Sequence, residues 1–250
     1  MQKKITSFLF LLLILAACKP AQKNTAAPAI NAYNYSGVKK VVAENGAVVS
    51  AHPLASKVGV EILKMGGNAV DAAIATQLAL AVVYPNAGNL GGGGFMVARL
   101  SNGETVALDY REKAPGQAHR DMYVETDGKA NTDKSQLGHL SSGVPGTVSG
   151  LFASHKYGKL AFEKLIQPAI ELAEKGFTIS ASEARSLNYL QNDLKKYNTV
   201  TPVFVKNTPW KQGDTLLQTD LANTLKRMQQ KGAAGFYEGE TARLIVEEMK

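Results

Sequence analysis

Four consecutive glycines, Gly91 to Gly94, stand directly before an apolar stretch that begins at Phe95. Glycine loses more backbone entropy on folding than any other residue, so four in a row suit only a place where side chains would obstruct the fold. The surrounding sequence predicts a turn that enters a strand over residues 95–98, then a second strand over residues 105–110 that ends beside Arg111. We therefore expect the backbone to approach another layer or a ligand closely at these glycines.

The first residues have the layout of an export signal. Two lysines precede an apolar run over residues 5–17, which is too short to span a bilayer and leads into Leu15-Ala16-Ala17-Cys18. That ending resembles the bacterial lipobox, in which a cysteine after small residues receives a lipid before the signal is removed. We expect residues 1–17 to be a signal peptide, and residues 18–37 to be a lipidated Cys18 with a flexible tether. The alternative for Cys18, the one cysteine of the sequence, is a free thiol.

Residues 38–250 are the expected folded domain. A chain of 250 residues with 45% hydrophobic residues can bury a substantial core. The formal net charge of +7 comes from lysines and arginines that are scattered rather than clustered on one element. This distribution argues against nucleic acid as a partner.

Periodicity and capping residues predict that helices dominate this domain. The strand from Phe95 continues as an apolar run, so we expect it to be buried on both faces. Pro168 implies either a break in its helix or a new first turn. The first expected elements are a short strand over 46–51, a helix from Pro53 to the Gly66-Gly67 stop, and a buried helix over 69–83 capped by Asn68. A polar excursion over 116–140 is expected after the two strands. The remaining expected helices run from 147 to either 155 or 157, over 161–175, over 181–196 after a Ser180–Glu183 capping box, over 220–231 after a cap at Thr219 or Asp220, and over 240–250.

The residue types that often mark catalytic or metal sites lack the spacing that such sites need. The four histidines lie far apart, with neither an i, i+4 pair nor a cysteine partner, so we predict no metal site. The glycine run fits neither phosphate-binding motif, and no Gly-x-Ser-x-Gly elbow occurs. We therefore predict no catalytic residue in this chain. His52 either positions a loop or ligand or is hydrogen-bonded near its helix start, and the second is favoured.

Arg111 is the candidate binding residue. It follows the second strand and is flanked by Asp109 and Glu112. A guanidinium presented there can bind a carboxylate through two parallel hydrogen bonds. The alternative is a surface ion pair with a neighbouring acid, which contributes well under about 1 kcal/mol.

Four segments together resemble the large-subunit motifs of the γ-glutamyltranspeptidase family, in order from about Val41 to the C-terminus. They are Gly66-Gly67-Asn68-Ala69-Val70-Asp71-Ala72-Ala73, Asn89-Leu90-Gly91-Gly92-Gly93-Gly94-Phe95-Met96, Asp109-Tyr110-Arg111-Glu112-Lys113-Ala114-Pro115 and Val144-Pro145-Gly146-Thr147.

The resemblance implies an α+β N-terminal-nucleophile hydrolase with a four-layer αββα sandwich, incomplete in this chain. Such a precursor cuts itself into a large and a small subunit. The new N-terminal threonine of the small subunit attacks γ-glutamyl amides such as glutathione, with its own α-amine as base, and the glutamyl group passes to water or an amino acid without a cofactor. By match, Arg111 binds the glutamyl α-carboxylate, and Glu112 either orients Arg111 or is a plain surface carboxylate.

No segment of this chain matches the family's threonine motif, so we expect residues 38–250 to be a partial large-subunit domain that is inactive alone. The expected partners are glutathione and other γ-glutamyl compounds, the small subunit, and a membrane reached through the Cys18 lipid, as for an exported bacterial lipoprotein in the periplasm or at the cell surface. The alternatives are a related glutaryl or cephalosporin acylase and a non-catalytic lipoprotein that binds small acids. Within the family fold, Gly91 to Gly94 either pack at the inner sheet, which is favoured, or form a wall of the glutamyl pocket.

Overall fold

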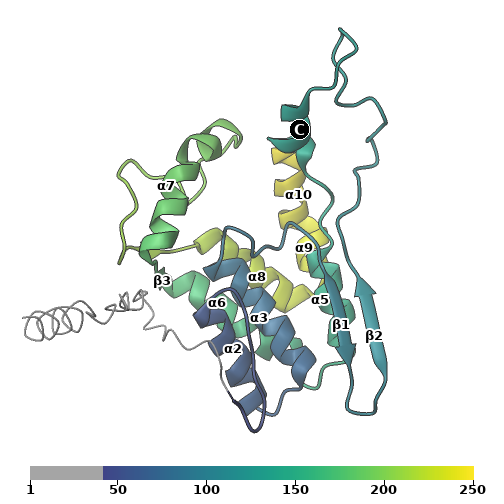
Figure 1. The fold of residues 1–250 in the computed structure, drawn as a ribbon, viewed down its shortest axis with the longest axis vertical. Helices are drawn as coiled ribbons and strands as arrows, with labels where there is room; N and C mark the ends of the chain where they lie inside the picture. The colour runs from purple at the N-terminus through teal and green to yellow at the C-terminus, as the bar shows by residue number, and fades with distance from the viewer. Residues whose placement is uncertain (1–41) are drawn as a thin grey trace, which may run out of the picture. The chain divides into compact units, whose positions relative to one another are not determined.

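A computed structural model of the protein describes residues 42–250. The predicted signal peptide, the lipidated Cys18 and the tether lie outside the described residues. The described part combines helices with two small antiparallel sheets (Figure 1). None of its helices is both long enough and apolar enough to cross a membrane.

Two helices joined at the Gly66-Gly67 stop form the centre of the fold. Helix α2 (Pro53–Lys64) begins after His52, and α3 (Ala69–Val83) begins with a capping box between Asn68 and Asp71, as predicted. Eleven of the fifteen residues of α3 are buried, which confirms the predicted burial on several sides. The two helices approach closely because Gly59 has no side chain: a Cβ there would lie 2.3 Å from Thr76 Oγ1.

Three further helices pack on this pair or on one another in the core. Helices α5 (Thr147–His155) and α6 (Phe162–Lys175) pack on α3, and α8 (Thr219–Lys231) packs on α6. Helix α6 runs through Pro168 without the predicted break or new start. Proline removes one backbone donor, but the apolar residues on either side, Ile166 and Ala169, are fully buried and hold the helix in place.

The remaining elements lie around this core. They are α4 (Thr132–Gln136), the 3₁₀ helix η1 (His139–Ser141), β3 (Phe177–Thr178), α7 (Ala181–Lys196), β4 (Thr215–Leu216), α9 (Ala234–Tyr237) and α10 (Gly239–Glu248). The predicted capping box of α7 is present, with Ser180 and Glu183 bonded to each other's backbone N–H groups. Helix α8 differs from the prediction, because its N-cap is Gln218 rather than Thr219 or Asp220. The Gln218 side chain does not cap α8 but donates to the Val82 carbonyl of α3 at 2.7 Å.

Residues 46–51 do not form the predicted strand. A strand is defined by backbone pairing with a neighbour, and no backbone hydrogen bond to this segment occurs within the described part of the chain. The apolar sequence is right for a strand, but its pairing partner is missing here.

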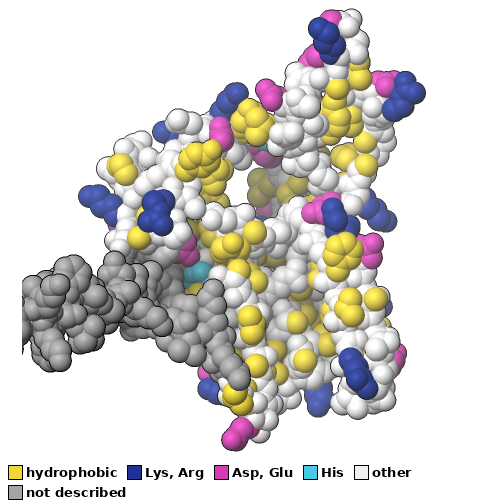
Figure 2. Space-filling model, viewed as in Figure 1, with side chains coloured by type: hydrophobic (Ala, Val, Ile, Leu, Met, Phe, Trp, Pro, Cys, Tyr) yellow, Lys and Arg dark blue, Asp and Glu magenta, His cyan; other side chains and the backbone are white. Residues whose placement is uncertain are grey.

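Strands β1 (Phe95–Arg99) and β2 (Thr105–Asp109) form an antiparallel hairpin in which Phe95 pairs with Asp109. Its inner face packs on the helical core through residues such as Met96 and Ala98. Its outer face is open: Phe95 is 61% exposed and Val97 84%. The prediction that this strand is buried on both faces is therefore wrong, because the core covers only one face. Figure 2 shows hydrophobic side chains at the surface over these strands.

Candidate functional site

The side chains at the end of β2 alternate between the two faces of the hairpin. Tyr110 continues the strand and points inward, and its N–H donates to the Gly94 carbonyl at 3.0 Å. Arg111, one residue later, stands on the open outer face, where its side chain is 63% exposed. Its guanidinium carbon lies 5.6 Å from the centre of the Phe95 ring, across the hairpin. Arg111 is thus presented outward over an aromatic platform.

Glu112 contacts the Arg111 guanidinium directly. Arg111 Nε donates to Glu112 Oε2 at 3.2 Å. The backbone N–H of Glu112 and the guanidinium both stabilise the carboxylate and lower the pKa of Glu112. The pair is exposed to solvent, so it sets a direction for the arginine but adds little to stability. The bond uses Nε, and the exposed guanidinium stays accessible to a second carboxylate.

The glycine run lies against the backbone that carries Arg111. A Cβ on Gly93 would lie 2.7 Å from the Glu112 nitrogen and 2.8 Å from the Arg111 Cα, and one on Gly94 would lie 2.8 Å from the Tyr110 ring. A Cβ on Gly92 would meet the Asn89 side chain at 2.5 Å, whereas Gly91 faces open space. The predicted close approach to another segment is confirmed at Gly93 and Gly94, where the neighbour is the continuation of the second strand. Gly92 is confined instead by Asn89 of its own turn.

Three of the four sequence motifs meet at this point. Asn89 Oδ1 accepts hydrogen bonds from the Gly92 N–H at 2.8 Å and from the Thr147 hydroxyl at 3.0 Å. The Gly92 carbonyl accepts from the N–H groups of Gly146 and Thr147. Lys113 and Val144 exchange backbone bonds of 3.2 and 2.8 Å. Segments that are up to about 60 residues apart in sequence therefore lie side by side around Arg111. We call these three segments, residues 89–94, 110–113 and 144–147, the frame of Arg111. No local sequence pattern reveals that they meet.

A cavity of about 980 Å³ lies beside this frame. It is bounded by residues 45–51, one face of α3, and the turn that includes Asn89, Gly93 and Gly94; Phe95 and Tyr110 also line it. Gly93 and Gly94 thus pack against the end of the second strand, as the favoured role predicts, and also line this cavity. Arg111 does not line it, so a role of the glycines in a glutamyl pocket stays a prediction. Thr76 Oγ1, in the cavity wall, is buried and has no hydrogen-bond partner among the described residues.

Comparison with known proteins shows which family the chain belongs to. The sequence profile of the family described as gamma-glutamyltranspeptidase matches residues 55–250. The chain belongs to the γ-glutamyltranspeptidase family. It is 49% identical to the glutathione hydrolase proenzyme of Pseudomonas sp. (strain A14) over 213 residues, which cover 84% of this chain and 37% of that protein. The chain therefore spans little more than a third of the length of this relative.

Solved structures agree with this membership. The Helicobacter pylori γ-glutamyltranspeptidase superposes with a TM-score of 0.80 at 45% identity, over 83% of this chain and 60% of that one. A cephalosporin acylase from Bacillus halodurans is more distant, with a TM-score of 0.71 at 27% identity over 85% of this chain and 41% of that one. The described part has the mixed helix and strand content of its γ-glutamyltranspeptidase neighbours.

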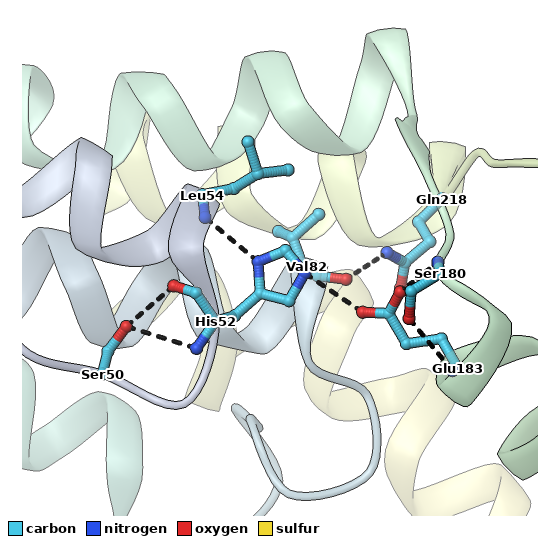
Figure 3. Close-up of polar contacts among 7 residues, drawn as sticks. All are labelled: Ser50, His52, Leu54, Val82, Ser180, Glu183 and Gln218. Atoms are coloured by element: carbon cyan, nitrogen blue, oxygen red, sulfur yellow. Dashed lines mark hydrogen bonds and ion pairs between the residues drawn. The ribbon is translucent and has the colours of Figure 1, made fainter. Parts of the chain in front are cut away.

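His52 connects two helices through hydrogen bonds of its ring. Its Nδ1 accepts the Leu54 N–H at 3.2 Å, and its Nε2 lies 3.0 Å from Glu183 Oε1 (Figure 3). The ring thereby joins the start of α2 to the capping box of α7. The favoured alternative, a hydrogen-bonded histidine at a helix start, is confirmed.

Within residues 42–250, no group of three or more His, Cys, Asp or Glu side chains is placed to hold a metal ion.

Sequence reasoning found Arg111 but missed the residues that frame it. The motifs contain Asn89 and Tyr110 but do not single them out, although an asparagine next to a glycine run is a common turn anchor. The inward direction of Tyr110 follows from strand alternation once the end of β2 is known. The binding of a glutamyl carboxylate by Arg111 stays a prediction for the γ-glutamyltranspeptidase chain.

Proposed function

We propose that this chain is part of the large subunit of a γ-glutamyltransferase and glutathione hydrolase. The observation that carries the proposal is the exposed Arg111 guanidinium, presented on the open face of the β1–β2 hairpin and oriented by Glu112 and Phe95. A planar fork in this position binds a carboxylate through two parallel N–H···O bonds. The glutamyl α-carboxylate is the ligand that fits it.

The reaction itself belongs to the small subunit of the same precursor. Its N-terminal threonine hydroxyl attacks the γ-carbonyl, the threonine amine takes the hydroxyl proton, and the amide nitrogen leaves protonated as the γ-glutamyl ester forms. Water or an amino acid amine then attacks the ester and restores the hydroxyl. Arg111 contributes by holding the substrate so that the γ-carbonyl faces the threonine.

The open outer face supports the need for a second subunit. A two-stranded hairpin that exposes Phe95 and Val97 to water is stabilised when another layer covers it. Residues 46–51 likewise have no backbone pairing partner among the described residues. A second sheet packed on the outer face of the hairpin would cover Phe95 and Val97 and complete the four-layer αββα sandwich.

Residues 19–250 alone and the longer precursor test this proposal. We expect the purified fragment neither to cleave itself nor to hydrolyse γ-glutamyl-p-nitroanilide, and the longer precursor to do both. Hydrolysis by the fragment would contradict the placement of the nucleophile in the small subunit. A processed precursor that is inactive on every γ-glutamyl amide but active on glutaryl amides would favour the acylase alternative.

The lipid on Cys18 is part of the same proposal for an exported, membrane-anchored enzyme. We expect the intact mass of the mature protein, purified from membranes, to correspond to a chain that begins at Cys18 and carries a diacylglyceryl group. A mature chain with a free thiol at Cys18, or one that begins after it, would contradict the anchor.

A further inference from the structure

Tyr110 fits its place because three residues around it lack side chains. Gly94 and Gly150 face its ring, and Gly146 faces its backbone carbonyl. We call this place the Tyr110 slot. A Cβ on Gly150, in α5, would lie 2.1 Å from the ring carbon Cγ, and a Cβ on Gly94 would lie 2.8 Å from Cε2. A Cβ on Gly146 would lie 2.0 Å from the Tyr110 carbonyl oxygen. Such distances are incompatible with any other residue unless the tyrosine moves.

The Tyr110 hydroxyl ties the slot to α3 and to the platform under Arg111. It lies 3.3 Å from Gln77 Oε1 and 3.2 Å from the Phe95 carbonyl oxygen, both acceptors. Burial raises the pKa of Tyr110, so the hydroxyl keeps its proton at neutral pH and donates. Phe95 is the residue whose ring lies under the Arg111 guanidinium. The same tyrosine thus holds the backbone of the platform and precedes the arginine.

Arg111 needs such a support because its own side chain has little. The guanidinium is mostly in solvent, and its bond to Glu112 is an exposed contact between neighbouring residues. Immobilising a long arginine side chain costs rotamer entropy, which an exposed pair of this kind does not offset. The backbone on both sides of Arg111 is fixed instead, by the Tyr110–Gly94 pair and by the Lys113–Val144 pair.

We propose that Tyr110, held in its glycine slot, is a positioning residue that sets where Arg111 meets the glutamyl carboxylate. The inference rests on the proposed function and adds a residue to it. Tyr110 touches no substrate in this scheme. It acts by holding the Arg111 backbone and the Phe95 ring in one arrangement. A displaced Tyr110 ring therefore moves the Arg111 guanidinium and weakens carboxylate binding, whereas the reaction at the γ-carbonyl is unchanged.

The first test displaces the ring without removing it, in the full-length processed enzyme. Gly94→Ala adds a methyl group against the far edge of the ring, and Gly91→Ala is the matched control because a Cβ there meets nothing within 4 Å. We expect Gly94→Ala to raise KM for γ-glutamyl-p-nitroanilide about tenfold with kcat changed less than about threefold, since small misplacements weaken binding first. Gly91→Ala should match the parent enzyme. Equal kinetics for the two variants would overturn the inference.

A substrate comparison separates positioning from a general defect in folding. The 4-aminobutyryl anilide lacks the α-carboxylate and so makes no use of Arg111. We expect Gly94→Ala to leave kcat/KM for this compound unchanged while it lowers kcat/KM for the γ-glutamyl anilide. An equal loss with both compounds would show a purely structural role for Tyr110 and overturn the inference.

The second test is a double-mutant cycle with Tyr110→Leu and Arg111→Ala, with Tyr110→Phe as the conservative variant. If Tyr110 acts through Arg111, Tyr110→Leu lowers kcat/KM in the parent enzyme but adds no loss when Arg111 is already absent. Tyr110→Phe should restore most of the activity, because it keeps the ring in the slot. If the losses in kcat/KM of the two single variants multiply in the double variant, the positioning role of Tyr110 is overturned, while the proposed carboxylate contact of Arg111 is not affected. An Arg111→Ala enzyme with normal KM would instead remove the proposed carboxylate contact itself. If Tyr110→Leu fails to fold, the Gly94→Ala comparison decides.

Discussion

Replacing Arg111 with alanine should lower kcat/KM for γ-glutamyl amides by about two orders of magnitude, equivalent to about 3 kcal/mol for truncating one partner of a hydrogen-bonded charge pair. The loss arises because the bound carboxylate gives up its hydration and finds no guanidinium in exchange. Arg111→Lys should recover only part of it, since an ammonium cannot form the two parallel bonds of a guanidinium. Initial rates with γ-glutamyl-p-nitroanilide measure both variants.

A second arginine in the same chain offers a matched control. Arg120 donates through Nε to the adjacent Asp121 at 2.9 Å, the same local arrangement as Arg111 and Glu112, and its side chain is 93% exposed. Arg120→Ala should therefore leave kcat/KM unchanged. An Arg111→Ala enzyme with kinetics like those of Arg120→Ala would contradict the binding role of Arg111.

Replacing Asp71 with asparagine should destabilise the folded protein by about 3 kcal/mol, within the range for losing hydrogen bonds to a buried charged group. The Asp71 side chain is completely buried. Its carboxylate accepts the N–H of Asn68 at 2.8 Å and that of Lys159 at 3.0 Å, so it holds the start of α3 and a distant turn together. An amide in its place would turn an N–H₂ group toward one of these donors and remove the charge that strengthens both bonds.

The melting temperature of the full-length protein measures this loss. For a domain of this size, about 3 kcal/mol corresponds to a fall of roughly 10 °C. Asp127→Asn is the control, because Asp127 also accepts a backbone N–H, from Lys129 at 3.0 Å, but does so in an exposed turn. A melting temperature for Asp71→Asn equal to that of Asp127→Asn would show that the buried carboxylate is not needed for stability.

Local sequence patterns predicted the helices well, because a helix is started and stopped by residues near its ends. The capping boxes at Asn68–Asp71 and Ser180–Glu183 are present as expected. Predictions failed where the outcome depends on a distant partner. The cap at Thr219 or Asp220 was wrong because Gln218 takes the N-cap position, while its side chain bonds to the carbonyl of Val82, 136 residues away. Residues 46–51 form no strand because their pairing partner is absent from the described residues.

The candidate site likewise combines features that follow from local sequence with features that depend on distant residues. Sequence alone determined that the glycine run needs a close backbone approach, and that an arginine follows the next strand, because both are properties of a short stretch of backbone. Only the tertiary structure decided that Tyr110 and Arg111 are what the glycines approach, that α5 supplies Gly150 to the slot, and that the outer face of the hairpin is open. These facts depend on which segments pack together, and packing is a relation between residues that are far apart in the chain.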